Sequence, residues 1–372
     1  MILIAGAGIG GLTLGCALAR LGRPFRIVDA APELMPAGAG IALSDNAFRA
    51  LAHLDLDEPV RACGQRLEEA AICDPNGRVI SGYRVGELMP GATIAMSRWS
   101  LQQALLKALG APVETGRRVT GYDARDDRVR VEFFDGDRCD ADLLVGADGL
   151  HSAVRRAMRG DERLRYSGST SWRALTEFDL AGTERFTETW GPRRRFGIVP
   201  IGGRGVYWFA VADAAAGGRD GTDRVAALRS RFAGWHEPID AIIASTPSER
   251  IIRTDIFDRR PVRKWTEGRV ALLGDAAHPM TPNMGMGGGQ AIEDAVVLAD
   301  AIAREPDIAH ALARYERARV ARANSFVTRS YLMGRVAHAP TAPLRWLRHR
   351  ALAAIPARVV ARAMKRDLDF TL

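Results

Sequence analysis

The chain has 372 residues, of which 47% are hydrophobic, and it carries a formal net charge of +8 at pH 7. This length allows one large or two medium domains with a substantial core. The charge does not indicate nucleic-acid binding, because residues 311–372 hold thirteen Lys/Arg and three Asp/Glu, which leaves the first 310 residues at about −2. We therefore expect a globular protein with a basic tail and no nucleic-acid partner.

The apolar residues 1–21 do not have the pattern of a signal peptide or a membrane span. They contain no basic n-region, and glycines at turn spacing interrupt the apolar run. The cysteines, Cys16, Cys63, Cys73 and Cys139, form no CxxC pair and no cluster with metal-ligand spacing. Free thiols are typical of a reducing compartment, so the sequence predicts a cytoplasmic location and no metal site.

A glycine-rich turn separates an apolar strand, predicted for residues 1–5, from a helix predicted for residues 12–21. In this context Gly6 permits the tight turn, Gly8 lets a pyrophosphate approach the backbone, and Gly11 lets the helix pack close to the strand. The start of the helix also offers unpaired N–H groups to phosphate. The turn therefore predicts a Rossmann-type dinucleotide site.

The second predicted strand, residues 25–28, ends at Asp29. Its distance from the glycine turn suits a carboxylate that accepts hydrogen bonds from ribose hydroxyls. A carboxylate here also disfavours a 2′-phosphate. We therefore expect Asp29 to bind the ribose of a dinucleotide that lacks this phosphate.

A second strand-turn-helix unit is predicted where the apolar residues 141–147 run into Asp148 and Gly149. Ser152 is placed to cap the helix that follows. Such a turn can present backbone N–H groups to phosphate, and the Asp148 carboxylate can bridge either to other turn amides or to a cofactor. Asp-Gly turns are common, so this segment supports a nucleotide site only together with the first turn.

Residues 166–258 have a different pattern, with strands joined by short turns, and residues 202–205 form the turn of a predicted hairpin. The chain then returns to a buried strand over residues 269–273, which runs into Gly274 and Asp275. This return predicts a first domain made of separate segments, with a mostly antiparallel sheet inserted into it.

In their order along the chain, these three segments resemble the single-component FAD-dependent aromatic hydroxylases, the para-hydroxybenzoate hydroxylase fold group, over about residues 1–330. The stretches 196–200, 282–285 and 291–295 look most similar to urate hydroxylases, salicylate hydroxylases and zeaxanthin epoxidases. The resemblance implies an α/β fold in which a discontinuous Rossmann-type FAD-binding domain carries an inserted, mostly antiparallel β-sheet substrate domain and a C-terminal helical tail. The expected boundaries are 1–73, 96–165 and 259–339 for the FAD-binding domain, 74–95 and 166–258 for the substrate domain, and 340–372 for one C-terminal helix.

The resemblance also implies roles for individual residues toward FAD. The glycine turn and Asp29 would hold the ADP half, and the segment at Asp148 would support the pyrophosphate and the use of NAD(P)H. Asp275 would contact the ribitol. Arg98, at the start of a predicted helix, would contact the cofactor, and Pro282 would lie against the isoalloxazine.

The backbone N–H groups of Gly285, Met286 and Gly287 would face the flavin pyrimidine if the resemblance holds. The family commonly has Gly-Gln-Gly here, so this chain departs from it at Met286. Binding through the backbone survives the change, whereas any contact of the Gln side chain is lost. Met286 can alternatively be a core side chain, because thioethers fill irregular gaps.

Arg195 and Tyr207, together with Pro282, are the predicted catalytic residues. Strand alternation turns Arg195 and Tyr207 toward the same side of a predicted hairpin. Their spacing resembles that of urate hydroxylase, in which such a pair binds and activates an anionic heterocycle. Arg195 would hold an oxyanion or ring carbonyl, and Tyr207 would assist loss of the substrate proton. The alternative is that Arg195 is one of three solvated arginines at 193–195 and that Tyr207 only packs.

The resemblance implies a monooxygenase that uses FAD, NADH or NADPH, and O2 to hydroxylate an electron-rich aromatic or heteroaromatic small molecule through a C4a-hydroperoxyflavin. The alternative with this fold is an FAD-dependent epoxidase of an olefinic or isoprenoid substrate, which a pocket without placed polar groups would favour. A third hypothesis is an FAD redox sensor that docks on an anionic membrane through a basic helix. We favour packing of that helix, with Leu344, Leu347, Ala351 and Ile355 at helical spacing, on the protein itself.

Overall fold

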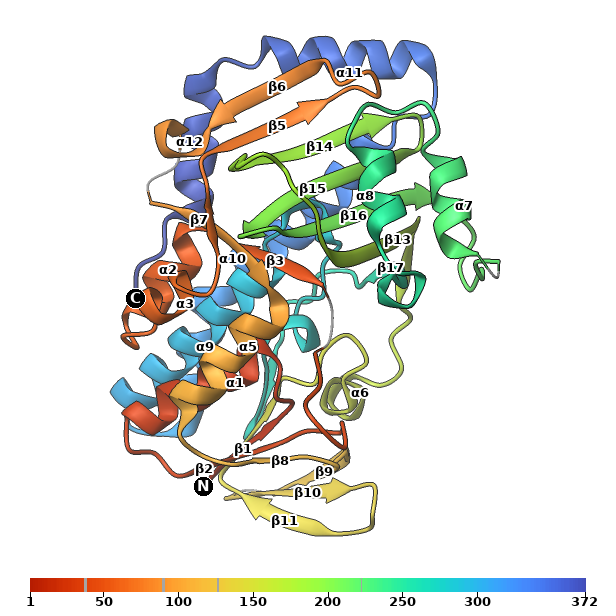
Figure 1. Cartoon of the computed structure of the whole chain (residues 1–372). Coiled ribbons are helices and arrows are strands. Elements are labelled where there is room, and N and C mark those ends of the chain that lie inside the picture. Colours follow the sequence, from red (N-terminus) through yellow and green to blue (C-terminus); the bar gives the residue numbers. More distant parts are fainter. Residues whose placement is uncertain (37–38, 89–90, 126, 222) are drawn as a thin grey trace.

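The computed structural model describes residues 1–36, 39–88, 91–125, 127–221 and 223–372. The lower half of the molecule in Figure 1 is built on a six-stranded sheet. In sheet order its strands are β18 (Thr266–Glu267), β19 (Val270–Leu272), β12 (Leu143–Gly146), β1 (Ile2–Ala5), β2 (Phe25–Val28) and β8 (Val113–Glu114). The central strand β1 pairs in parallel with both β2 and β12. The strand order therefore reverses at β1, the place where Rossmann-type sheets bind nucleotides.

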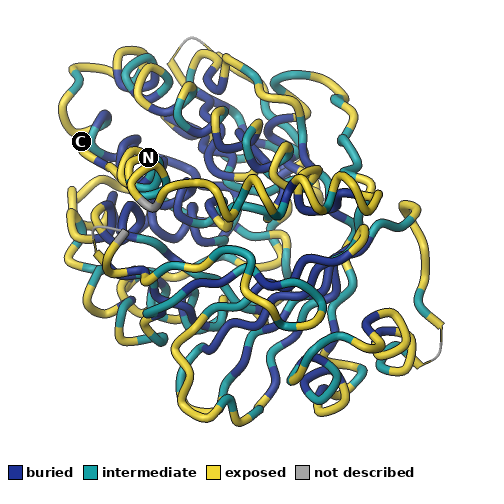
Figure 2. The backbone as a smooth tube through the Cα atoms, turned by 90° about the horizontal axis from the view of Figure 1, so that it is seen from above, coloured by how far each residue is buried: buried dark blue, intermediate teal, exposed yellow. Residues whose placement is uncertain are grey.

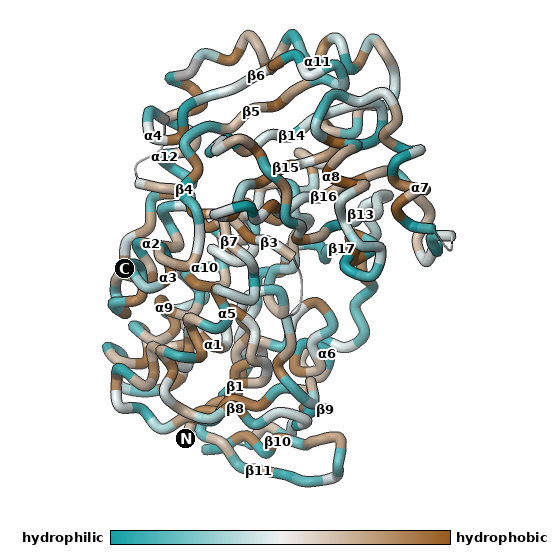
Figure 3. Tube along the Cα trace, viewed as in Figure 1, coloured by the Kyte–Doolittle hydropathy of each residue, from teal (hydrophilic) through white to brown (hydrophobic). Residues whose placement is uncertain are grey.

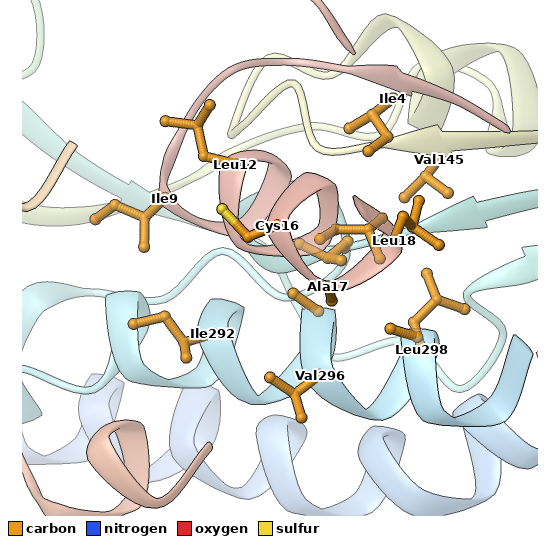
Figure 4. Packing of buried hydrophobic residues seen from close by; sticks show 14 of the residues in the cluster. Ile4, Ile9, Leu12, Cys16, Ala17, Leu18, Val145, Ile292, Val296 and Leu298 are labelled. Carbon is orange, nitrogen blue, oxygen red and sulfur yellow. The ribbon is translucent and has the colours of Figure 1, made fainter. Parts of the chain in front are cut away.

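Helices α1 (Ile9–Arg20) and α9 (Gly287–Arg304) pack side by side next to this sheet. In Figure 4, Cys16 and Ala17 of α1 lie close to α9, on which Ile292 and Val296 are labelled. The first ten residues of α1 are buried, which explains why its sequence is apolar on every side. These contacts hold the start of α1 directly after the glycine turn.

The upper half of Figure 1 contains a seven-stranded sheet, which confirms the predicted, mostly antiparallel insertion. In sheet order its strands are β17 (Ile252–Asp258), β13 (Arg165–Glu177), β16 (Gly205–Asp213), β15 (Arg194–Gly202), β14 (Arg185–Gly191), β5 (Glu69–Cys73) and β6 (Val79–Arg84). Only β14 and β5 pair in parallel. Strand β5 thus joins this sheet although it precedes the boundary expected at residue 74, and the domain boundaries stay a prediction.

The remaining strands form two small sheets, and further helices precede the tail. Two three-stranded sheets have the orders β11 (Arg138–Ala141), β10 (Val129–Phe133), β9 (Val119–Ala124), and β3 (Gly40–Leu43), β7 (Thr93–Ser97), β4 (Gln65–Leu67). The other helices before the tail are α2 (Asp45–Ala52), α3 (Asp57–Arg61), α4 (Val85–Leu88), α5 (Arg98–Leu109), α6 (Ala153–Arg159), α7 (Arg224–Arg231), α8 (Ile239–Ser245) and α10 (Ile308–Ala337), with the short 3-10 turns η1 (Ser248–Arg250), η2 (Gly274–Ala276) and η3 (Pro282–Met284).

A buried network of charged side chains joins α9 to α10 and to the turn that contains Asp275. The carboxylate of Asp294 accepts hydrogen bonds from His278 at 2.5 Å and from Arg319 at 2.7 Å. It also accepts one from the backbone N–H of Gly274 at 3.0 Å. Although burial by itself would raise the pKa of Asp294, His278 and Arg319 bring this pKa down to about 2. The ionised carboxylate therefore fixes the turn before Asp275 onto α9.

The tail forms two helices, α11 (Ala342–Ala354) and α12 (Ala357–Leu368), so the expectation of one helix over residues 340–372 is wrong. Pro356 is the reason, because the residue before a proline is disfavoured in helical conformation, and Ile355 is extended. Within the described residues, none of the helices has the length and apolar character that a membrane crossing requires.

Candidate active site

A cavity of about 1320 Å³ begins at the carboxyl end of β1 and continues along one face of the seven-stranded sheet. Single-ligand pockets typically have about 300–1,000 Å³, so this volume suits a dinucleotide together with a substrate. Twelve of the thirteen predicted site residues line the cavity: Gly6, Gly8, Asp29, Arg98, Asp148, Arg195, Tyr207, Asp275, Pro282, Gly285, Met286 and Gly287. Gly11 is not among the lining residues, since it packs behind the turn.

The glycine turn has the shape that a pyrophosphate needs. Gly6 has φ +110°, and a Cβ atom there would lie 2.4 Å from the carbonyl oxygen of Ala147. A Cβ on Gly11 would lie 2.0 Å from the carbonyl oxygen of Gly6, so α1 packs tightly against the turn. A Cβ on Gly8 would instead meet no atom of the described residues within 4 Å, and none of their side chains caps α1 at Gly8. Open space beside uncapped N–H groups fits a phosphate.

Gly8→Val is expected to give a folded protein that does not retain FAD. The backbone of Gly8 is extended, with φ −74° and ψ −177°, so it accepts a side chain that would project only into the cavity. Gly11→Val should instead destabilise the fold by about 1–3 kcal/mol or more, because its side chain overlaps the turn. Flavin absorbance after reconstitution and thermal denaturation of the apoprotein separate the two effects. Retention of FAD by Gly8→Val would contradict a pyrophosphate at this place.

Asp29 and Asp148 both stabilise the turns that carry them. Asp29 accepts hydrogen bonds from the backbone N–H groups of Ala7 at 2.7 Å and Ala31 at 2.8 Å, which leaves lone pairs toward the cavity. One oxygen of Asp148 accepts from the N–H of Ala153 at 2.8 Å, whereas the other oxygen is buried and has no partner among the described residues. Burial raises the pKa of Asp148, although hydrogen bonds in the turn act oppositely. Asp148 lines the cavity, but this unpaired oxygen itself is enclosed by protein atoms.

Asp275 follows Gly274, whose φ of +61° turns the chain sharply out of β19. The Asp275 side chain is reached by solvent through the cavity, yet enough protein surrounds it that burial raises its pKa. Arg98, at the start of α5, and His278 act in the opposite direction on this pKa. The structure thus brings Asp275 and Arg98 to one cavity. A carboxylate there could accept a hydrogen bond from a cofactor hydroxyl, with a positive charge nearby.

The N-terminus of α9 points at the cavity through the segment that contains Gly285, Met286 and Gly287. Gly285 has φ +65°, and α9 begins at Gly287 without a side-chain cap. Uncapped N–H groups at the start of an 18-residue helix stabilise negative charge, which fits the electron-rich edge of a reduced flavin. Met286 is buried and packs in a cluster with Phe326 and Leu368, so it has the packing role and also lines the cavity.

The sheet face above this helix carries the predicted substrate residues. Arg195 pairs with Val211, and Tyr207 pairs with Val199, in the antiparallel register of β15 and β16. Arg195 and Tyr207 therefore lie on one face, four residue pairs apart along the ladder. The Phe209 ring lies between them, 6.0 Å from the Arg195 guanidinium and 5.9 Å from the Tyr207 ring. The shared face is as predicted from strand alternation. Two polar groups at the ends of an aromatic wall suit a planar ligand.

Arg195 is not one of three solvated arginines. Its side chain is 2% exposed, whereas that of Arg193 is 62% exposed. The Arg195 guanidinium donates to Glu188 at 2.7 Å and to the side-chain oxygen of Asn283, while its Nε has no partner among the described residues. Glu188 therefore neutralises much of the Arg195 charge, and Asn283 joins this arginine to the segment next to Pro282.

Several residues of the cavity were missed by sequence reasoning. Arg173 of β13 pairs with Phe209, lines the cavity and acts on Tyr207, whose pKa is raised by burial and lowered by Arg173 and Arg195. Strand alternation along β13 is the signal that could have shown Arg173. Met364 and Leu368 of α12 also line the cavity, and no local pattern could have placed them there. Within the described part of the chain, no group of His, Cys, Asp and Glu could hold a metal ion.

The comparisons with known proteins agree with this geometry. The family model described as an FAD binding domain matches residues 1–330. Aurachin C monooxygenase/isomerase of Stigmatella aurantiaca is 45% identical, over 100% of this chain and 98% of that protein. The FAD-dependent urate hydroxylase of Klebsiella pneumoniae is 35% identical, over 88% of each chain.

Among solved structures, Klebsiella pneumoniae HpxO complexed with FAD and uric acid superposes with a TM-score of 0.93 and 32% identity. This match covers 99% of this chain and 96% of that one. The residues around the glycine turns fit FAD, and NAD(P)H is the reductant typical of the family. With its cofactor-shaped cavity, its family match and these relatives, the chain belongs to the single-component FAD-dependent aromatic hydroxylases and is an FAD-dependent monooxygenase.

Proposed function

We propose that this monooxygenase hydroxylates an electron-rich aromatic or heteroaromatic small molecule with NADH or NADPH as reductant and O2 as co-substrate. Bound FAD would supply the transfer of electrons from NAD(P)H to O2. The observation that carries the proposal is the aromatic wall at Phe209, flanked by Arg195 and Tyr207, in the cavity that also contains the cofactor residues. The FAD-dependent urate hydroxylase, a relative that acts on a heteroaromatic ring, supports it.

In this proposal Arg195 and Arg173 orient an oxygen of the substrate ring, and Tyr207 donates a hydrogen bond to it. The hydroxyl of Tyr207 makes no hydrogen bond to any described residue, so it is free for a ligand. Because burial raises its pKa, Tyr207 keeps its proton at neutral pH. We therefore propose that Tyr207 stabilises a substrate oxyanion rather than acting as a free base, which refines the role expected from the sequence.

The same cavity argues against the epoxidase alternative. An olefin offers no partner to the guanidinium of Arg173 or to the hydroxyl of Tyr207, and both residues line the cavity. Covering such groups with an apolar ligand costs their hydration without replacing it. A substrate with ring oxygen or nitrogen atoms satisfies them.

The proposal is tested by a substrate screen with the purified, FAD-loaded protein. Aromatic and heteroaromatic compounds and isoprenoid olefins are compared for acceleration of NADH and NADPH oxidation, and mass spectrometry scores the oxygenated product rather than peroxide. A ring-hydroxylated product supports the proposal. Formation of epoxides alone would contradict it.

Arg195→Gln is expected to lower kcat/KM about 10-fold to 100-fold, because a charge-assisted hydrogen bond to the substrate is lost. This variant also leaves Glu188, which is only 8% exposed, without its ion pair, so some stability is lost as well. The matched control is the double variant Arg195→Gln/Glu188→Gln, which should regain stability but not kcat/KM. Recovery of kcat/KM in the double variant would assign Arg195 a structural role only.

We also propose a cytoplasmic location. All four cysteines are free, as is usual in a reducing compartment. Fractionation of cells that express the protein would test this, and secretion into an oxidising compartment would contradict it.

A further inference from the structure

Helix α11 has its polar and apolar faces inverted relative to an ordinary surface helix. Arg348 is buried, with its guanidinium donating to the carbonyl oxygen of Ala337 at 2.6 Å and lying 5.2 Å from the Trp190 ring. The apolar side chains turn outward, since Leu344, Trp346 and Leu347 are 49%, 64% and 58% exposed. Helix α11 does pack on the protein, as favoured from the sequence, but by its polar side.

This helix lies over the edge strand β6 at the top of Figure 1, and the view from above in Figure 2 shows it largely in the colour of exposed residues. Figure 3 shows hydrophilic and hydrophobic residues alternating along it. The end of α10, which Arg348 touches, adds further exposed apolar side chains: Leu332, Met333 and Val336. Apolar side chains gathered in this way mark an interaction surface, whereas single ones do not.

The charge of the segment that contains α11 bears on the choice of partner. Residues 317–366 contain twelve Lys/Arg and no Asp/Glu, although Arg319, Arg322, Arg329 and Arg366 pair with acidic residues outside this segment and Arg348 is buried. Arg335 and Arg350 are exposed and form no ion pair with a described residue. A second copy of the chain would bring the same positive charge to this surface, so self-association is disfavoured. Leu and Trp side chains bordered by unpaired arginines fit the interface of an anionic bilayer.

We propose that α11 docks on an anionic lipid surface through Leu344, Trp346 and Leu347. The apolar side chains enter the boundary between headgroups and acyl chains, and Arg335 and Arg350 lie at the headgroups. This inference is independent of the substrate, since it rests on exposed residues outside the cavity.

The test is sedimentation of the full-length, FAD-loaded protein with vesicles. We expect capture by mixed phosphatidylglycerol and phosphatidylcholine vesicles, decreasing with salt, and little capture by pure phosphatidylcholine. Leu344→Ser/Leu347→Ser should lower the partition coefficient at least about tenfold. The matched control Leu21→Ser/Met35→Ser also removes two exposed apolar side chains, 41% and 60% exposed, and should leave capture unchanged.

Arg335→Gln and Arg350→Gln test the charge separately and should each lower partitioning about fivefold. Flavin content and melting temperature should stay at wild-type values in all variants, because the altered side chains are exposed. The proposal is overturned if vesicles do not capture the wild type, if pure phosphatidylcholine captures it equally, or if Leu344→Ser/Leu347→Ser is captured as well. It is also overturned if analytical ultracentrifugation shows a dimer that Leu344→Ser/Leu347→Ser dissociates while no vesicle binds.

Discussion

Replacing Arg319 by Met is expected to lower the free energy of unfolding by about 3–5 kcal/mol. Arg319 is 1% exposed and donates to Asp294 at 2.7 Å, to the side-chain oxygen of Gln290 at 2.7 Å and to Glu293. Methionine fills similar space, but it leaves the buried carboxylates of Asp294 and Glu293 with less positive charge beside them. The cost of uncompensated buried charge exceeds the net stabilisation that the ion pair gives when intact.

Arg314→Met is the matched control for Arg319→Met, because it makes the same substitution on the same helix, α10. Arg314 contacts Asp300 at 3.1 Å, but its side chain is 35% exposed. The expected loss is below about 1 kcal/mol, since water screens the pair. Urea titrations of the apoproteins, followed by circular dichroism, give both values. Equal losses in the two variants would show that the buried network adds nothing to stability.

The pH of acid unfolding should differ between Arg319→Met and the wild type, because the buried network contains Asp294. The folded-state pKa of Asp294 is about 2, below the usual value of about 4 for an unfolded chain, so its contribution to stability is present above about pH 4 and is lost as the pH falls toward 2. Without Arg319, one of the groups that lower this pKa is absent. The variant should therefore unfold at a higher pH than the wild type, and coincident acid transitions would contradict the assigned cause.

Tyr207→Phe is expected to keep the fold and FAD while it lowers product formation about 100-fold or more. Tyr207 lines the cavity, and its hydroxyl has no partner among the described residues, so its removal costs little stability but removes a donor to the substrate. Because burial raises the pKa of Tyr207 above its usual range, the phenol should keep its proton at neutral pH. Tyr207 should therefore cause no loss of rate between pH 6 and 9.

Tyr166→Phe is the control for Tyr207→Phe, since it removes a hydroxyl from the same sheet. Tyr166 is on β13, and its hydroxyl donates to the carbonyl oxygen of Ala214 at 2.7 Å outside the cavity lining. This variant should lose some stability and no activity. Single-turnover measurement with a substrate from the screen compares the two. A wild-type rate in Tyr207→Phe would show that the aromatic wall alone positions the substrate.

The part of the cavity next to the glycine turn could be located from the sequence because its signals are local. Gly6, Gly8 and Asp29 lie within one strand-turn-helix-strand unit, and the positive φ and close backbone approach at Gly6 are requirements that only a few residue types meet. The segments at Asp148 and Asp275 repeat this logic at the ends of two further strands, β12 and β19. Parallel pairing of β12 with β1 and with β19 then brings these three turns to the same edge of the six-stranded sheet.

The part of the cavity at the seven-stranded sheet could be predicted only in part. Alternation showed that Arg195 and Tyr207 share a face, but neither the pairing of Arg195 with Glu188 nor the place of Arg173 can be derived from one strand. Glu188 comes from the neighbouring strand β14, and its contact with Arg195 depends on register between strands. The sequence therefore suggested a free arginine where the structure has a buried ion pair.

The sequence by itself determined the chemistry of this protein, because backbone geometry at glycine turns and carboxylates at strand ends depend on a few neighbouring residues. The tertiary structure decided what surrounds that chemistry. Contacts between α9 and α10 bury the charges of Asp294 and Arg319, and packing of α12 brings Met364 to the cavity. It also turned α11 so that Arg348 faces inward and Leu347 outward, since the orientation of a helix depends on distant partners as well as on its own periodicity.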